Sequence, residues 1–187
     1  MQVAAVSGLL VASVAHADVA MVENGLDSGQ GSLREALASG ATEIVIATGD
    51  DITIYTPLTY AGEDALELIG NGNTISTPNN INMLQLTQGA SLTISDLHFE
   101  GPDGWSILNQ AVSPAGKGIF IDVRDGQKGK VRLTATNLSV AGVANHGIHI
   151  SDCDLADECG GGGGGAGGGS PASIVVTFNG VSLDSVG

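Results

Sequence analysis

The sequence has few aromatic residues, few basic residues and no long apolar run. Trp, Tyr and Phe make up 3% of the 187 residues, which disfavours a core built from aromatic rings and limits carbohydrate binding by ring stacking. Lys and Arg number 6 against 20 Asp and Glu, giving a formal net charge of -14. A surface of that sign repels a phosphate backbone, so we expect no nucleic-acid partner.

The longest apolar run is too short to cross a bilayer, which needs about 20 apolar residues, so we expect no membrane span. The run Val3 to Ala15 ends in Ala15-His16-Ala17, a site of the A-x-A type at which signal peptides are cleaved. We therefore predict a signal peptide at residues 1–17 and a secreted or cell-surface chain that begins at Asp18. Because no Lys or Arg precedes the run, the alternatives are a true start that lies upstream and an apolar first strand.

The remaining composition favours one folded domain made of short strands. Hydrophobic residues account for 42% of the chain and charged residues for 14%, so the chain can bury a core and is not a disordered acidic tail. The 29 glycines indicate many turns. Together these features predict an all-β protein with stacked or layered strands.

An internal repeat supports stacking. Three segments share the pattern apolar-Thr-apolar-polar-polar/Gly-apolar-polar-apolar, and their leading apolar residues, Leu92, Leu133 and Val176, are 41 and 43 residues apart. A strand-like unit of the G-I-x-I type precedes each segment; these units are Met83–Leu86, Gly118–Ile121 and Gly147–Ile150. The alternation gives every unit one apolar face that it cannot bury alone. Stacked units would bury these faces in a continuous ladder, so we predict a solenoid with a corner at the middle of each repeat segment.

The segments before the repeats fit the same scheme. Glu43–Ile46, Asp51–Ile54 and Ala65–Ile69 followed by Asn73–Ile75 read as strands. Residues 31–39 predict the one convincing helix, because Ser32 can cap its start with Glu35 three residues on. Such a helix is well placed to cover one end of a solenoid.

These residues carry a resemblance to a known family. Asp27-Ser-Gly-Gln-Gly-Ser-Leu-Arg-Glu-Ala-Leu37, the Ile-x-Ile strands and Ile69-Gly-Asn-Gly-Asn-Thr-Ile75 resemble the start of secreted bacterial proteins of the pectin-lyase-like superfamily. The resemblance implies a right-handed parallel β-helix (solenoid) over residues 18–187, with the S-L-R-E-A segment as a short N-terminal capping helix. It says almost nothing about function, because the superfamily includes lyases, hydrolases, adhesins and surface proteins.

The enzymes of that superfamily cut acidic polysaccharides, and one part of the sequence fits their chemistry. Asp122, Arg124 and Asp125 place an Arg between two carboxylates at the end of a predicted strand. In a lyase, carboxylates would hold calcium against the substrate while the base removes an alpha proton. The alternative is a solvated corner with an exposed ion pair. His146 and His149 lie in a segment similar to one of the hydrolases, but without its partner motifs we expect a turn residue and an outward-facing strand residue.

A second group of carboxylates lies beside the only two cysteines. Asp152, Asp154, Asp157 and Glu158 suit calcium, although their spacing is not that of an EF-hand, and a solvated acidic loop is the alternative. In an exported chain, Cys153 and Cys159 are expected to form a disulfide, with free thiols or metal ligation as the alternatives. Nine of the ten residues from 160 to 169 are Gly, so we predict a Gly-rich loop insertion over about residues 152–172.

No convergent catalytic set emerges beyond these residues. Trp105, on a predicted loop, is the best candidate for a ligand contact; alternatively it covers one end of the core. We therefore expect a surface or extracellular module with a structural, adhesive or glycan-binding role, which needs no cofactor beyond the calcium considered above. A polysaccharide lyase or hydrolase is the alternative.

The last repeat ends without a predicted cap. Residues 178–187 contain no polar helix or Pro-rich turn to cover the final coil. An open coil presents backbone groups and an apolar interior that recruit another strand. We expect this end to be continued by a longer solenoid or covered by a partner, such as another copy of the chain.

Overall fold

The computed structural model describes residues 18–103, 116–124, 126–151 and 170–186, which form eleven strands and one short helix. The element bounds, in chain order, are β1 Val19–Val22, α1 Leu33–Ala38, β2 Glu43–Ile46, β3 Ile52–Thr53, β4 Leu58–Tyr60, β5 Leu66–Ser76, β6 Leu84–Leu86, β7 Leu92–Glu100, β8 Ile119–Asp122, β9 Lys130–Ala141, β10 Ile148–Ser151 and β11 Ser173–Asp184. No helix among these residues is long and apolar enough to cross a membrane.

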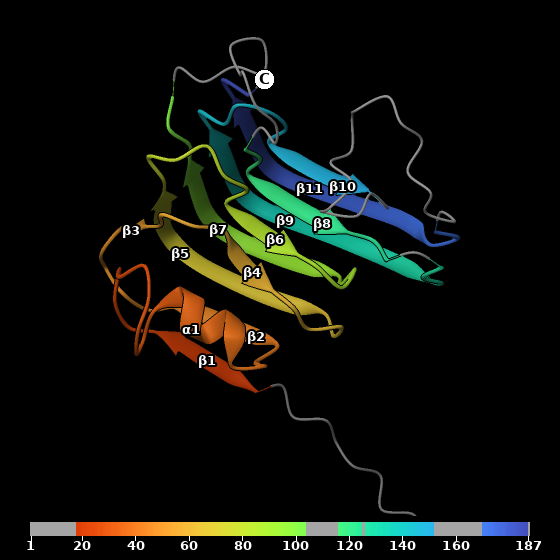
Figure 1. Cartoon of the computed structure of the whole chain (residues 1–187), viewed down its shortest axis with the longest axis horizontal. Coiled ribbons are helices and arrows are strands. Elements are labelled where there is room, and N and C mark those ends of the chain that lie inside the picture. The colour runs from red at the N-terminus through yellow and green to blue at the C-terminus, as the bar shows by residue number, and fades with distance from the viewer. Residues whose placement is uncertain (1–17, 104–115, 125, 152–169, 187) are drawn as a thin grey trace, which may run out of the picture.

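The strands form two sheets in which every pairing between described strands is parallel. The first sheet has the order β1-β2-β5-β7-β9-β11, with β3 also paired to β5, and the second has the order β10-β8-β6-β4. From β4 onward, successive strands alternate between the two sheets. Figure 1 shows this progression from the N-terminal strands at one end to β10 and β11 at the other.

The core consists of apolar ladders on the inner faces of both sheets. In the first sheet Leu66 pairs with Leu92, and Leu92 pairs with Leu133; all three side chains are buried. In the second sheet Leu84 pairs with Ile119, one rung of a similar buried column. Aliphatic side chains from successive strands therefore stack on one another, and their removal from water is the main stabilising contribution.

The predicted corner in the middle of each repeat segment is present in the backbone. Asp96, Asn137 and Gly180 have positive φ angles of 51°, 49° and 66°. These are left-handed conformations, which Gly, Asn and Asp adopt at least cost. The Asn137 side-chain amide also donates a hydrogen bond to Asp96 Oδ1 across 2.9 Å. Strands β7, β9 and β11 thus each contain a left-handed residue at the middle of the repeat segment, and the corners of β7 and β9 are joined by a side-chain hydrogen bond.

Helix α1 covers the N-terminal end of the core, as the sequence predicts. Ser32 Oγ accepts a hydrogen bond from the Glu35 backbone N–H at 3.2 Å, and Glu35 Oε2 accepts one from Gly31 N–H at 2.7 Å. The buried side chains of α1 are Leu33, Ala36 and Leu37. They pack toward β1, β2 and β4, so α1 closes this end with its apolar face inward.

The structure confirms a fold made almost wholly of strands and changes three details of the sequence prediction. The strand predicted at Asp51–Ile54 is limited to β3, and the segment Asn73–Ile75 is the second half of β5 rather than a separate strand. The third change concerns the ladder. Val176 pairs with Leu133 as predicted, but its side chain is 44% exposed, so this rung is not internal.

Candidate functional site

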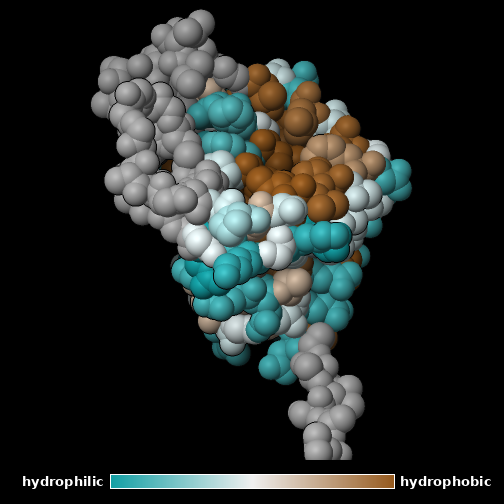
Figure 2. Space-filling model, turned by 90° about the vertical axis from the view of Figure 1, so that its right-hand side faces the viewer, coloured by the Kyte–Doolittle hydropathy of each residue, from teal (hydrophilic) through white to brown (hydrophobic). Residues whose placement is uncertain are grey.

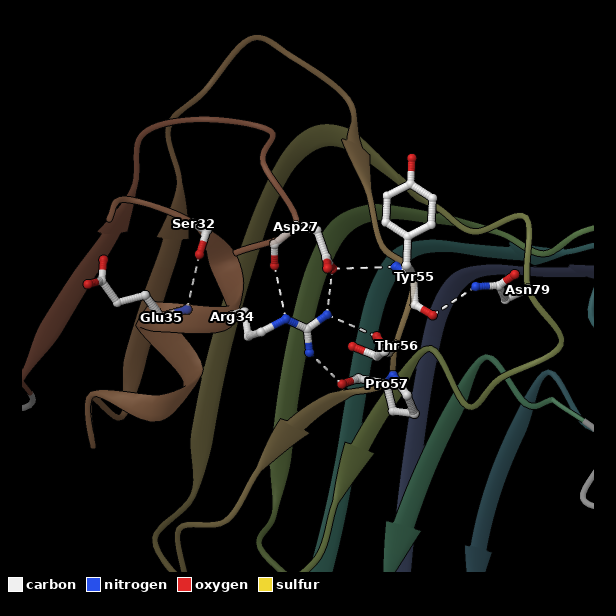
Figure 3. A network of polar contacts seen from close by, with 8 residues as sticks. All are labelled: Asp27, Ser32, Arg34, Glu35, Tyr55, Thr56, Pro57 and Asn79. Atoms are coloured by element: carbon white, nitrogen blue, oxygen red, sulfur yellow. Dashed lines mark hydrogen bonds and ion pairs between the residues drawn. The ribbon is translucent and has the colours of Figure 1, made fainter. Parts of the chain in front are cut away.

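A polar network fixes the N-terminal cap, and Arg34 is its centre (Figure 3). The Arg34 guanidinium donates to the backbone carbonyls of Asp27, Thr56 and Pro57 at 2.9, 3.0 and 2.6 Å, and its Nη2 forms an ion pair with Asp27 Oδ1 at 2.5 Å. Each of the two side chains is 26% exposed. One planar group thereby joins α1 to the segment between β3 and β4.

The same network extends to the next turn of the stack. Asp27 Oδ1 also lies 3.4 Å from the Tyr55 backbone N–H, and the Asn79 side-chain amide donates to the Tyr55 carbonyl at 2.8 Å (Figure 3). Apart from Asp27 Oδ1, the acceptors of the hydrogen bonds from Arg34 and Asn79 are backbone carbonyls that no strand pairing uses. Arg34 and Asn79 therefore satisfy turns that would otherwise hydrogen-bond to water, which is a structural role.

Arg124, the candidate base, lies two residues after the end of β8, an interior strand of the second sheet. Its Nη1 donates to Glu63 Oε1 at 2.7 Å and lies 3.5 Å from Gln88 Oε1. The Arg124 and Glu63 side chains are 41% and 69% exposed, so this ion pair is solvated and contributes little stability. Gln127 holds the turn that follows β8 by accepting from the Arg124 backbone N–H at 3.1 Å.

Asp122 is the last residue of β8 and is half-buried beside Ser151 of β10 in the parallel register. Asp125 lies outside the described residues. Among the residues that the structure describes, Glu63, 61 residues away in the chain, places a carboxylate at the Arg124 guanidinium. Sequence reasoning missed Glu63, because only the stacking of distant coils brings the two residues together.

A second cluster lies on the outer face of the second sheet, where His149 of β10 pairs in register with Phe120 of β8. The ring centroids of these two residues are 5.3 Å apart, and the His149 ring stacks on the exposed His146 ring at 4.7 Å. Lys117 Nζ lies 5.4 Å from the centroid of the Phe120 ring. His149 thus faces outward, as expected from the alternation of its strand.

The environment of His149 favours its neutral form. Burial, with smaller contributions from the charges of His146 and Lys117, lowers the pKa of His149 from 6.5 to about 4. Its Nδ1 is buried and has no hydrogen-bond partner among the described residues. A neutral imidazole packs against Phe120 as a largely apolar ring, and its stacking on His146 could not be predicted from the local pattern.

The end of the stack opposite α1 is apolar and open to solvent. The exposed side chains there belong to β11 and are Ile174, Val176, Phe178 and Leu183, with exposures of 48%, 44%, 50% and 45%. Their partners in β9, namely Val131, Leu133, Ala135 and Val140, are buried. Figure 2 shows an extended hydrophobic area on this end of the molecule.

The second sheet contributes to the same end. Ile148 and Ile150 of β10 pack against the core but are only partly buried, whereas their partners in β8, Ile119 and Ile121, are buried. The last strands of both sheets therefore expose apolar residues of the face that is buried in the preceding strands. We call the residues Ile148, Ile150, Ile174, Val176, Phe178, Val181 and Leu183 the open end.

Several predicted site residues lie outside the described part of the chain. They are the ligand-contact candidate Trp105, the calcium candidates Asp152, Asp154, Asp157 and Glu158, and the cysteines Cys153 and Cys159. The contact, the calcium site and the disulfide remain predictions. Within the described ranges, no group of three or more His, Cys, Asp and Glu side chains could hold a metal ion.

Comparisons with protein-family profiles, with curated proteins and with solved structures find no match to this chain. The functional argument therefore rests on the contacts described above. Of these surfaces, the open end is the one whose exposed apolar side chains are not covered by any other part of the described chain.

Proposed function

We propose that the chain is an exported, extracellular structural or adhesive module, built as a right-handed parallel β-helix of the pectin-lyase-like type. The parallel pairing, the alternation of successive strands between two sheets and the repeat length of 41 and 43 residues support a solenoid. Right-handedness follows from the strong preference of parallel crossover connections for that hand.

One observation carries the functional part of the proposal: the two ends of the core differ. Helix α1 packs its apolar face onto the N-terminal end, whereas the open end exposes the same ladder that is buried everywhere else. A last coil with an exposed inner face needs a further coil or another chain to cover it, because isolated repeats cannot bury their inner face. The function that fits is assembly into a longer or multimeric extracellular structure.

The polar clusters support this role rather than catalysis. Arg34 is committed to backbone carbonyls of the cap, and Arg124 is committed to Glu63 and Gln88 across neighbouring coils. For the alternative, a lyase acting on acidic polysaccharides, Arg124 would have to leave this ion pair and meet a uronate held by calcium on an acidic protein.

Activity on uronates separates the two functions. We expect no unsaturated product from pectate or alginate, with or without calcium, measured by ultraviolet absorbance of the product. The variants Arg124→Ala and, as a matched control, Arg132→Ala should behave like the parent chain. Product formation that Arg124→Ala abolishes and Arg132→Ala preserves would replace the structural module by the lyase.

Export is tested separately on the protein that cells release. N-terminal sequencing of the released chain should give Asp18 as the first residue, because cleavage after Ala17 removes the predicted signal. An intracellular chain that retains residues 1–17 would contradict the extracellular part of the proposal.

A further inference from the structure

An apolar row crosses the outer face of the first sheet near α1. Met21 of β1, Val45 of β2 and Ile69 of β5 occupy one register position on three adjacent strands (Figure 1). Along the strands they alternate with core residues such as Ile44 and Leu68, which are buried, so their side chains point away from the core. Met21 is 49% exposed, and the other two are partly exposed. Three apolar side chains therefore lie side by side on the solvent face of the sheet.

This row does not arise from where the chain begins or ends. Strands β2 and β5 each have a paired strand on both sides, so Val45 and Ile69 lie on a continuous face rather than at an edge. At the same register position the next three strands have Ser95, Thr136 and Asn179. The fold thus accepts polar residues at this position, and the apolar row is a feature of β1, β2 and β5 alone.

Two carboxylates border the apolar row. Glu43 of β2 and Glu67 of β5 lie in register on neighbouring strands, two residues before Val45 and Ile69 and on the same face. Like charges at opposed positions of a sheet repel each other. Neither carboxylate forms an ion pair with another described residue. We call Met21, Val45, Ile69, Glu43 and Glu67 the outer patch.

The charge of the outer patch favours a basic partner. The protein has a formal net charge of -14, so a second copy or an anionic lipid surface is repelled. A partner with Lys or Arg side chains is attracted to Glu43 and Glu67 and relieves their mutual repulsion. Its apolar residues would at the same time cover the neighbouring row. The partner that fits is therefore both basic and apolar on one face.

The spacing of the strands favours a helix over an extended segment. Neighbouring strands lie about 4.7–4.9 Å apart, so the apolar side chains repeat at this interval across the sheet. Side chains at i and i+4 of a helix are about 5–6 Å apart, whereas side chains on one face of an extended segment are about 6.6 Å apart. A helix that crosses the strands can thus place successive apolar residues over Met21, Val45 and Ile69.

We infer that the outer patch binds a basic amphipathic helix of another protein, which lies across β1, β2 and β5. Apolar residues at i, i+4 and i+8 of that helix pack on the apolar row. Lys or Arg side chains on its adjoining face pair with Glu43 and Glu67. The outer patch lies on the first strands of the sheet and the open end on the last, so this inference does not depend on the proposed structural role.

Binding of a synthetic helical peptide to the full 187-residue chain tests the inference. The probe peptide has leucine at three successive i, i+4 positions and lysine beside them. One control peptide has the same residues in scrambled order, and a second has glutamate in place of lysine. Isothermal titration calorimetry at an ionic strength of about 0.1 M, where charges more than about 10 Å apart are largely screened, should show one-to-one binding of the probe. Both control peptides should bind at least about fivefold more weakly.

A matched pair of variants separates the outer patch from a general attraction to an acidic protein. Glu43→Gln with Glu67→Gln should weaken binding of the probe at least about fivefold, because two ion pairs are lost. Glu100→Gln with Asp184→Asn removes two carboxylates from the outer face of β7 and β11. This control should change the affinity less than about twofold, because its carboxylates lie away from the bound helix.

The apolar row is tested with substitutions that keep β-branched side chains. Val45→Thr with Ile69→Thr should weaken binding of the probe at least about threefold, because apolar contact area is lost. Val175→Thr, at an outward-facing position of β11, is the control and should leave the affinity unchanged. Circular dichroism establishes that each variant folds, and the glutamine variants test the same patch if the threonine variant does not.

Three results would overturn the outer patch as a site for a basic helix. They are no binding of the probe, equal weakening by the patch and control carboxylate variants, and equal binding of the probe and the scrambled peptide. A fourth result, self-association of the chain that Val45→Thr with Ile69→Thr abolishes, would overturn it in favour of a second copy on the same face. Light scattering of the parent chain and of this variant measures that association.

Discussion

Val176 lies opposite Leu133 on the same rung of one ladder, yet Leu133 is fully buried and Val176 is 44% exposed. The two residues share a position in the repeat and a similar side chain. Their burial differs because Leu133 has a strand on each side, β7 and β11, whereas Val176 has only β9. The end of the stack, rather than the local sequence, sets the environment of Val176.

This pair gives a matched test of the ladder. Leu133→Asp should lower the free energy of unfolding by at least about 4 kcal/mol, or abolish the cooperative transition altogether, because it places an uncompensated charge in the core. Val176→Asp should change the free energy of unfolding by no more than about 0.5 kcal/mol. Chemical denaturation at low protein concentration measures both. Equal effects of the two substitutions would show that the register is wrong.

Arg34 is predicted to be more important to stability than its exposure suggests. Arg34→Lys keeps the charge but cannot reach the carbonyls of Thr56 and Pro57 together with Asp27. We expect it to lower the free energy of unfolding by about 1–3 kcal/mol. The control is Arg132→Lys, at an exposed position of β9, which should have almost no effect. Indistinguishable denaturation curves for the two variants would mean that the Arg34 contacts to the cap do not persist in solution.

Substitutions at Asn137 distinguish the effect of backbone strain on stability from the effect of a lost side-chain contact. Both Asn137→Gly and Asn137→Ala remove the hydrogen bond to Asp96, but only alanine must adopt the positive φ of 49° with a side chain that disfavours it. The alanine variant should therefore be about 1 kcal/mol less stable than the glycine variant. If alanine proves as stable as glycine, the corner is not left-handed at this position.

His149 should make stability depend on pH. Its pKa is lowered from 6.5 to about 4 in the folded chain, so the unfolded chain binds more protons between these values and stability falls as the pH drops through that window. Above about pH 6.5 the contribution is fully present. The variant His149→Gln should show a smaller loss of stability from pH 6.5 to 4 than the parent, in denaturation curves at several pH values.

The control for this prediction is His98→Gln, on the outer face of the first sheet, where His98 Nδ1 lies 2.7 Å from Ser139 Oγ. It should retain the pH dependence that His149 confers. A nuclear magnetic resonance titration of the His149 ring provides an independent check, and a midpoint near 6.5 would refute the buried environment described above.

Much of the local structure could be read from the sequence because its causes are local. The cap at Ser32, the amphipathic face of α1 and the alternation in the repeat segments each depend on residues a few positions apart. The left-handed corners at Asp96, Asn137 and Gly180 also follow from residue type, since these residues tolerate positive φ. The pattern shared by the three repeat segments was enough to predict that β7, β9 and β11 pair in this order.

The polar contacts could not be predicted in this way. Arg124 pairs with Glu63, 61 residues earlier, because the segments that follow β4 and β8 leave the same end of the parallel second sheet. The sequence suggested that Arg124 acts with the carboxylates beside it in the chain. The local sequence does not show which distant segment lies next to Arg124 in the folded chain. Arg34 likewise finds acceptors 22 and 23 residues away.

The sequence by itself determined most of the strands, the corners, the capping helix and the register of the repeat segments, because hydrophobic alternation and residue type act over short distances. Only the tertiary structure decided which rungs are buried and which side chains meet across coils. Burial depends on whether a further strand covers a residue, and that is a property of the whole stack. Identical apolar positions therefore form the core at Leu133 and an open surface at Val176.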